Sequence, residues 1–110
     1  MPDTGRIELS TLLSIISHNR LFYGEVENYT EDFSSYLKAG EDVDSYTLAV
    51  NDTLIVSNEE LVTPLVKYTV QAKEINDSYT NTAHITITVT TSEGRVTVRL
   101  IPFVTEKVPE

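Results

Sequence analysis

The chain has 110 residues and no cysteine, so it is long enough for one domain and excludes disulfide bonds and thiolate metal sites. Its 17 acidic and 8 basic side chains give a net charge of −9, which repels phosphate backbones, so we expect no nucleic-acid partner. No stretch approaches the roughly 18 consecutive apolar residues of a membrane span, so we expect no membrane insertion.

The first segment, residues 1–23, contains an apolar stripe. Its side chains follow the i, i+3, i+4, i+7 spacing of a short amphipathic helix: Leu9, Leu12, Leu13 and Ile16. A two-residue spacing typical of a strand fits the same window, so both alternatives stay open. As a helix, the stripe would either dock on a partner protein or cap the open end of the chain's own sheets. We interpret residues 1–23 as a helical or arm segment and as the candidate for attachment.

Alternating β-branched and aromatic residues dominate the chain after this segment. The first predicted strand starts at Val26 and lies at a sheet edge, with Tyr29 and Phe33 as core anchors. Asp32 then caps a single helical turn, which ends at Gly40. This stretch therefore predicts an edge strand followed by a tight turn.

The middle of the chain predicts three further strands, over residues 43–50, 54–56 and 65–74, with a loop over residues 57–64. The first and last of these strands alternate between apolar and polar residues, as expected when one face of a sheet is buried. In the first strand, Tyr46, Leu48 and Val50 share one face. In the last strand, the predicted inward side chains are Val66, Tyr68, Val70 and Ala72.

The clearest pattern is a β-hairpin over residues 83–101, with two alternating arms around a four-residue loop, residues 91–94. This loop length places Thr90 opposite Arg95. The resulting register puts six apolar side chains on one face: Ile85, Ile87, Val89, Val96, Val98 and Leu100. The opposite face then carries Thr86, Thr88, Arg95, Thr97 and Arg99, and we interpret it as an ordinary solvent-exposed face or as a polar interface with a neighbouring copy.

Strand signals recur about every ten residues, which is typical of two packed antiparallel sheets. We therefore predict an all-β fold, an immunoglobulin-like antiparallel β-sandwich of six or seven strands with a short N-terminal helix or arm. A small barrel is the alternative. The sandwich is expected to comprise residues 24–103, because Pro102 should end the last strand and leave residues 104–110 as a tail.

Catalytic and metal-binding patterns are weak in this sequence. His18 and His84 are the two imidazoles, and the alternation places His84 on the threonine side of the hairpin, where we expect it to be exposed. The acidic residues Glu41, Asp42 and Asp44 lack the spacing of a calcium loop, so we interpret them as a solvated turn. We predict no catalytic residue, no metal site and no cofactor.

Two segments, residues 29–43 and residues 87–98, together carry a resemblance to a known family. The first leads from an aromatic and acidic strand end into a Leu-x-Ala-Gly-x-Asp turn, and the second contains a Thr-Thr-Ser-x-Gly-Arg turn between alternating arms. In this order and separation they resemble the small immunoglobulin-like domain of tailed-bacteriophage virion proteins called phage fiber-tail adaptors. The resemblance covers about two-thirds of the chain, roughly residues 26–101.

The resemblance implies a non-enzymatic virion protein, assembled in the cytoplasm of a host bacterium, that acts as an oligomeric connector or adaptor at the tail or fibre attachment. It implies other virion proteins as partners (tail, fibre, portal or major capsid protein) and further copies of the chain. A capsid decoration protein is the alternative within a virion, and a cellular surface or carbohydrate-binding module is the alternative from another class. The expected interface residues are Leu9, Leu12, Leu13, Ile16, Arg95 and Arg99.

Overall fold

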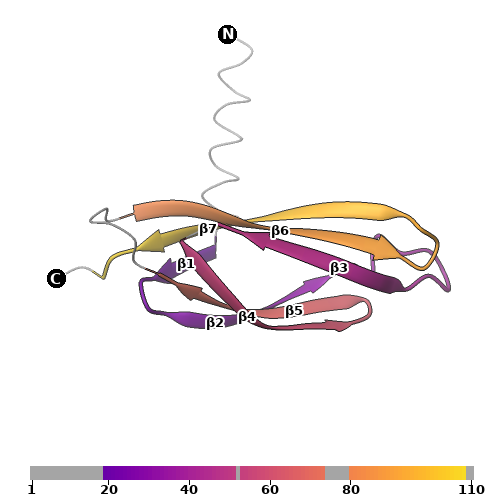
Figure 1. The fold of residues 1–110 in the computed structure, drawn as a ribbon, viewed down its shortest axis with the longest axis horizontal. Coiled ribbons are helices and arrows are strands. Elements are labelled where there is room, and N and C mark those ends of the chain that lie inside the picture. The colour runs from indigo at the N-terminus through magenta and orange to yellow at the C-terminus, as the bar shows by residue number, and fades with distance from the viewer. Residues whose placement is uncertain (1–18, 52, 74–79, 109–110) are drawn as a thin grey trace, which may run out of the picture.

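The computed structural model describes residues 19–51, 53–73 and 80–108, and these form seven β-strands in two sheets without a helix (Figure 1). The prediction of an all-β fold with six or seven strands is confirmed for this part of the chain. The expected N-terminal helix lies outside the described residues. The strands are β1 (Asn19–Phe22), β2 (Val26–Asp32), β3 (Val43–Val50), β4 (Leu54–Val62), β5 (Leu65–Ala72), β6 (Thr80–Thr91) and β7 (Val96–Glu106).

The strands divide into a four-stranded sheet A, in the order β1-β7-β6-β3, and a three-stranded sheet B, in the order β2-β5-β4. Figure 1 shows β6 and β7 in the upper layer and β2, β4 and β5 in the lower layer. All neighbouring strands are antiparallel except β1 and β7, which pair in parallel. The core fills the space between the two layers.

Strong alternation in the sequence corresponds to strands in the structure. In β5, the four predicted inward residues are buried and the residues between them are only half-buried, which confirms the prediction for this strand. The bounds of β3 are those predicted, and its Tyr46 and Leu48 pack against the core. Strand β2 lies at an edge of sheet B, as expected, and Phe33 directly after it is 1% exposed.

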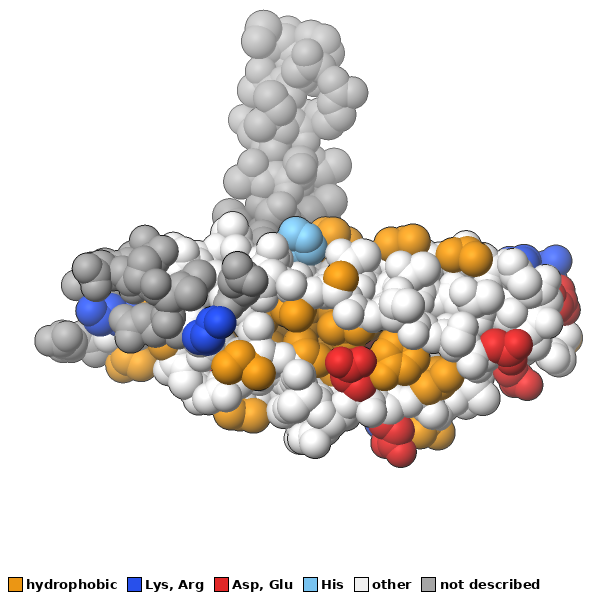
Figure 2. All heavy atoms as spheres, in the orientation of Figure 1, with side chains coloured by type: hydrophobic (Ala, Val, Ile, Leu, Met, Phe, Trp, Pro, Cys, Tyr) orange, Lys and Arg blue, Asp and Glu red, His pale blue; other side chains and the backbone are white. Residues whose placement is uncertain are grey.

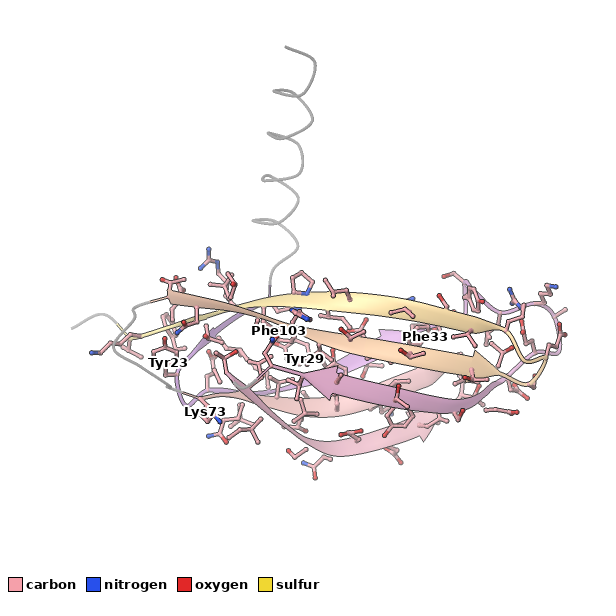
Figure 3. All side chains as sticks on the ribbon, turned by 45° about the horizontal axis from the view of Figure 1, so that its top comes forward. Tyr23, Tyr29, Phe33, Lys73 and Phe103 are labelled. Carbon is pink, nitrogen blue, oxygen red and sulfur yellow. The ribbon has the colours of Figure 1, made fainter. Side chains whose placement is uncertain are left out.

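Aromatic side chains from both sheets meet in the middle of the sandwich (Figure 3). The Tyr29 ring stacks on the Tyr68 ring with centroids 5.8 Å apart, and it contacts the Phe103 ring edge-on with centroids 5.3 Å apart. Both geometries suit the quadrupoles of the rings. Burying each such side chain contributes about 1.5–3 kcal/mol as an upper estimate, so this aromatic contact is a main link between the two layers.

The register of the β6–β7 hairpin differs by one residue from the predicted register. Thr90 lies opposite Val96 instead of Arg95, and Ile87 lies opposite Arg99. The loop is one residue shorter than expected, because the Thr91 N–H donates to the Arg95 carbonyl at 2.8 Å. Gly94 permits this closure with a φ of +79°, a left-handed conformation typical of a three-residue hairpin loop with a bulge.

In this register, the side chains of β7 point to the opposite face from the one predicted. The side chains of Ile85, Ile87 and Val89 are fully buried, as predicted. Those predicted to join them from β7 face solvent instead: Val96, Val98 and Leu100 are 57%, 60% and 59% exposed. The prediction that all six apolar side chains share one face is therefore wrong, because the Gly94 turn consumes one residue fewer than expected.

Strand β4 also departs from the predicted bounds. It continues to Val62 through most of the expected loop, residues 57–64. Its pairing with β5 shifts between Ser57 and Glu60, and Asn58 adopts a φ of +52° at this bulge. The bulge absorbs the residues that interrupt the alternation, so a polar stretch that resembles a loop in the sequence remains part of the sheet.

Pro102 was expected to end the last strand, but β7 runs through it to Glu106. Pro102 lies opposite His84, whose N–H donates to the Asn51 side chain at 2.6 Å, on the β3 side of β6. The backbone N–H and C=O of His84 therefore point away from β7, and His84 and Pro102 form a pair without hydrogen bonds between them. The β6–β7 ladder for this reason requires no N–H from Pro102. Sheet A therefore extends beyond the predicted 24–103 body at both ends, through β1 and through residues 104–106.

Candidate protein-binding face

The outer surface of sheet A carries a continuous set of small, uncharged side chains. Residues paired across an antiparallel ladder point to the same face, and the pairs here are Thr86 with Leu100, Thr88 with Val98 and Thr90 with Val96. Strand β3 adds a third row through its own pairing with β6. We call this surface the neutral face, and it consists of Ser45, Thr47, Ala49, Thr86, Thr88, Thr90, Val96, Val98 and Leu100.

The neutral face contrasts with the charge of the rest of the chain. None of its nine side chains is ionisable, and the next side chain on this face of β6 is the exposed His84, whereas the chain carries a net charge of −9. Figure 2 shows hydrophobic side chains spaced along the upper rim, the side where Figure 1 places β6 and β7, with acidic side chains lower and at the right end. A row of exposed apolar side chains with no charged side chain beside it makes this surface a candidate for contact with another protein.

Arg95 lies on the other side of β7, away from the neutral face. Its Nε donates to Glu41 Oε2 at 2.9 Å, and its Nη2 donates to both Glu41 Oε1 and the Tyr36 carbonyl, the latter at 2.8 Å. The guanidinium also lies 4.3 Å from the centre of the Tyr36 ring. The prediction that Arg95 shares a face with Thr86 and Thr88 is therefore wrong, while its role at an interface stays a prediction.

Glu41 is the most constrained carboxylate of this cluster, because its side chain has no exposed surface. It accepts hydrogen bonds from Arg95, from the Thr91 hydroxyl at 2.5 Å and from the Lys38 N–H at 2.8 Å. The bonds from Arg95 lower the pKa of Glu41 to about 2, although burial acts in the opposite direction. Glu41 therefore binds the hairpin end instead of facing a solvated turn.

Arg99 also faces the space between the layers. Its Nη1 donates to the Asp32 carbonyl at 3.1 Å and to Glu31 Oε1 at 3.4 Å, and its guanidinium lies 4.1 Å from the centre of the Phe33 ring. Glu31 in turn accepts from the Tyr68 hydroxyl at 3.1 Å. The pKa of Tyr68 is raised, mainly by burial and further by the Glu31 charge. Arg99 therefore ties β7 to β2, and Glu31 ties β2 to β5.

The remaining predicted residues are less informative. Leu9, Leu12, Leu13, Ile16 and His18 lie outside the described residues. His84 is exposed, as expected. Within residues 19–51, 53–73 and 80–108, no three His, Asp or Glu side chains gather as metal ligands.

A shallow groove of about 330 Å³ is lined by Tyr23 in the turn between β1 and β2, by residues of β4 and β5, and by Lys73 (Tyr23 and Lys73 are labelled in Figure 3). Its other lining residues are Gly24, Ile55, Gln71 and Ala72. Asn81 donates to the Tyr23 hydroxyl at 2.6 Å, so this phenol already has a structural partner. The neutral face is therefore the better candidate for a binding site.

Sequence reasoning missed the neutral face, because it assigned Val96, Val98 and Leu100 to the core. The signal that could have revealed it is the glycine at the end of the turn, which favours a three-residue hairpin loop. No protein-family model matches this sequence, and no curated protein matches it. The described part of the chain also has no helix long and apolar enough to cross a membrane.

Proposed function

We propose that this chain is a structural protein of a tailed-bacteriophage virion, in which an immunoglobulin-like sandwich serves as a connector or adaptor at the tail or fibre attachment. The neutral face is the observation that carries the proposal. Three neighbouring strands of an acidic chain present only uncharged side chains there, and one row of them is apolar and more than half exposed. Such a face favours burial against another protein.

The strand order supports an immunoglobulin-like type of sandwich. In that fold one sheet contains the order B-E-D and the other the order C-F-G. If the seven strands are lettered A to G in chain order, β2-β5-β4 corresponds to B-E-D and β3-β6-β7 corresponds to C-F-G. Strand β1 joins β7 in parallel instead of pairing with β2, which makes β7 an inner strand at its C-terminal end.

The two segments that carry the family resemblance lie against each other, which also supports the proposal. The Asp42 N–H donates to the Ser92 hydroxyl at 3.0 Å, and the Ser92 N–H donates to the Asp42 carbonyl at 2.8 Å. Arg95 and Glu41 add the charged contact described above. The two segments are 50 residues apart at Asp42 and Ser92, yet they form one structural unit at the end of the hairpin.

The size of the neutral face indicates how it would be used. Three strands about 4.8 Å apart and five residues at about 3.3 Å each span roughly 15 by 15 Å, well below the 800 Å² that a stable interface buries on each partner. We propose that the apolar stripe of residues 9–16 supplies further contact area. Several copies on a symmetric virion body would then hold together through many small contacts.

Val98→Lys tests the neutral face. The substitution places a charge in the middle of the face at a position 60% exposed in the free protein, so the fold should tolerate it. We expect incorporation into particles to fall by about tenfold or more, because a desolvated lysine opposes association. The matched control is Ile55→Lys in sheet B, which is 44% exposed and should incorporate normally. Equal incorporation of both variants would remove the neutral face from the proposal.

Deleting residues 1–18 tests the attachment role of the N-terminal segment. The deletion ends before β1, so the parallel pairing of Asn19–Phe22 with β7 is retained. We expect a folded truncated protein, checked by its thermal unfolding, that incorporates poorly into particles. Normal incorporation would show that the neutral face suffices and that residues 9–16 have no part in attachment.

A further inference from the structure

The four terminal strands of the two sheets differ in how they resist pairing with another chain, and β7 adds a further edge over residues 96–102, where the Tyr36 hydroxyl binds the Val96 carbonyl and Pro102 lies at the end. Natural sheets protect their edges with charges, bulges or short strands. Strand β1 has four residues, β2 carries acidic side chains and β4 carries both a bulge and acidic side chains. The acidic residues are Glu27, Glu31 and Asp32 in β2 and Glu59 and Glu60 in β4. Strand β3 carries an acidic residue, Asp44, and a bulge only at its start, between Val43 and Ser45, and from Ser45 to Val50 it has none of these features.

The backbone groups at the β3 edge follow from the ladder. The His84 N–H points towards β3, where it meets Asn51, so the backbone groups of the next residue, Ile85, point towards β7. Val50 lies opposite Ile85, and its N–H and C=O therefore point away from β6. Alternation along the strand gives Tyr46 and Leu48 the same outward direction. Since β3 is the terminal strand of sheet A, these groups line its edge.

We propose that a second copy of this chain extends sheet A by pairing with β3 in antiparallel orientation about a two-fold axis. In the register centred on Leu48, Leu48 lies opposite Leu48 of the other copy, and Tyr46 lies opposite Val50. This register pairs all three outward residues with one another. Each such pair exchanges two hydrogen bonds, so the three pairs satisfy the N–H and C=O groups on this edge of both copies.

The side chains of β3 fit this arrangement. No charged residue lies opposite another between Ser45 and Val50, although each copy carries a net charge of −9. Val50 is 39% exposed in the single chain and would contact the aromatic ring of Tyr46 from the other copy. The neutral faces of the two copies would join into one surface of twice the width. The inference extends the proposed function, because it holds whichever larger body that surface binds.

Val50→Pro tests the edge pairing. Because the Val50 N–H points outward, proline at this position leaves the β3–β6 ladder intact and removes only an edge donor. The contact is smaller than a standard interface, so we expect the wild-type mass to rise from one copy towards two between about 10 µM and 1 mM in sedimentation equilibrium. Val50→Thr, which keeps the N–H, should behave like the wild type, whereas Val50→Pro should weaken association at least about tenfold.

A wild-type protein that stays monomeric over this range, or a folded Val50→Pro variant that associates as well as Val50→Thr, would overturn the proposal. Cysteine cross-linking maps the register independently, because the chain has no cysteine of its own. Thr47 and Ala49 lie opposite each other in the proposed register. An oxidised equimolar mixture of Thr47→Cys and Ala49→Cys should therefore yield a cross-linked pair, since the Cα atoms would lie within disulfide range.

Thr88→Cys is the matched control for cross-linking. Thr88 lies on the same neutral face as Thr47 and directly opposite it, but on an inner strand. Mixed with Ala49→Cys, it should remain uncross-linked under the same conditions. Cross-linking through Thr88 as efficient as through Thr47 would show that copies meet face to face, and it would overturn the edge arrangement.

Discussion

Replacing Ile101 by alanine should lower the free energy of unfolding by about 2–5 kcal/mol, because it empties a buried site that its neighbours cannot fill. Ile101 is 7% exposed and lies opposite Ile85, which is fully buried. It also occupies the part of β7 next to the aromatic contact of Phe103 and Tyr29. Chemical denaturation of both proteins at neutral pH measures the difference directly.

The adjacent residue, Leu100, is the matched control for this prediction. Replacing Leu100 by alanine removes the same number of carbon atoms as replacing Ile101 by alanine. However, Leu100 is 59% exposed on the neutral face. Leu100→Ala should therefore change the free energy of unfolding by no more than about 0.5 kcal/mol. The reverse order, with Leu100→Ala the more damaging substitution, would contradict the observed hairpin register and restore the register expected from a four-residue loop.

Glu41→Gln should lower the thermal unfolding midpoint at pH 7 by at least about 5 °C, since it leaves the Arg95 guanidinium without its counter-charge. The Glu41 side chain has no exposed surface and accepts bonds from three different residues, so water cannot easily replace the lost interaction. The amide of glutamine fits the same space, which limits the change to charge and hydrogen bonding. Thermal unfolding followed by circular dichroism gives the two midpoints.

The pH dependence separates the charge of Glu41 from its packing. Its pKa is about 2 in the folded chain, against an ordinary value of 4.5. A lowered pKa means that the stabilisation is fully present above about pH 4.5 and is lost as the pH falls towards 2. The midpoints of the wild type and of Glu41→Gln should therefore converge over this range.

Asp42→Asn is the control for this pair, because Asp42 follows Glu41 directly but is exposed. Its unfolding midpoint at pH 7 should lie within about 2 °C of the wild type. A constant difference between the wild type and Glu41→Gln from pH 6 to pH 2.5 would show that the Glu41 charge does not stabilise the fold.

Much of the sandwich is predictable from the sequence, because its strands bury one face and leave the other in contact with water. Strand β5 is the clearest case: every second residue from Val66 to Ala72 is buried, and the sequence pattern alone predicts this set. The bounds of β3 were predictable for a related reason, since an acidic turn and Asn51 enclose its alternation. Local periodicity carries the information in both strands.

The features that sequence reasoning missed depend on backbone conformations at single residues. The positive φ of Gly94 sets the hairpin register, and the bulge at Asn58 keeps β4 in the sheet. Pro102 is compatible with β7 only because it lies opposite His84, a position that needs no N–H from it. A periodicity analysis contains none of these facts, because each depends on how a neighbouring strand is placed.

The candidate site was predictable only in part. The hairpin was recognised as the element that presents a polar outer surface, and its three threonines at positions 86, 88 and 90 do face outward. The predicted register placed the side chains of the wrong face of β7 beside these threonines. It therefore predicted Arg95 and Arg99 at the positions where Val96, Val98 and Leu100 lie. A one-residue shift in one turn thus exchanged a cationic surface for an apolar one.

The two margins of sheet A are not equivalent, and this limits how large an assembly the sheet can form. On the β7 side, β1 pairs with residues 103–106, the Tyr36 hydroxyl donates to the Val96 carbonyl at 3.2 Å and Arg99 holds the Asp32 carbonyl. These contacts occupy the two ends of the β7 margin, whereas the β3 margin presents the outward N–H and C=O groups of Tyr46, Leu48 and Val50. A two-fold contact through β3 uses the same margin of both copies, so this contact closes as a pair and does not by itself extend into a filament.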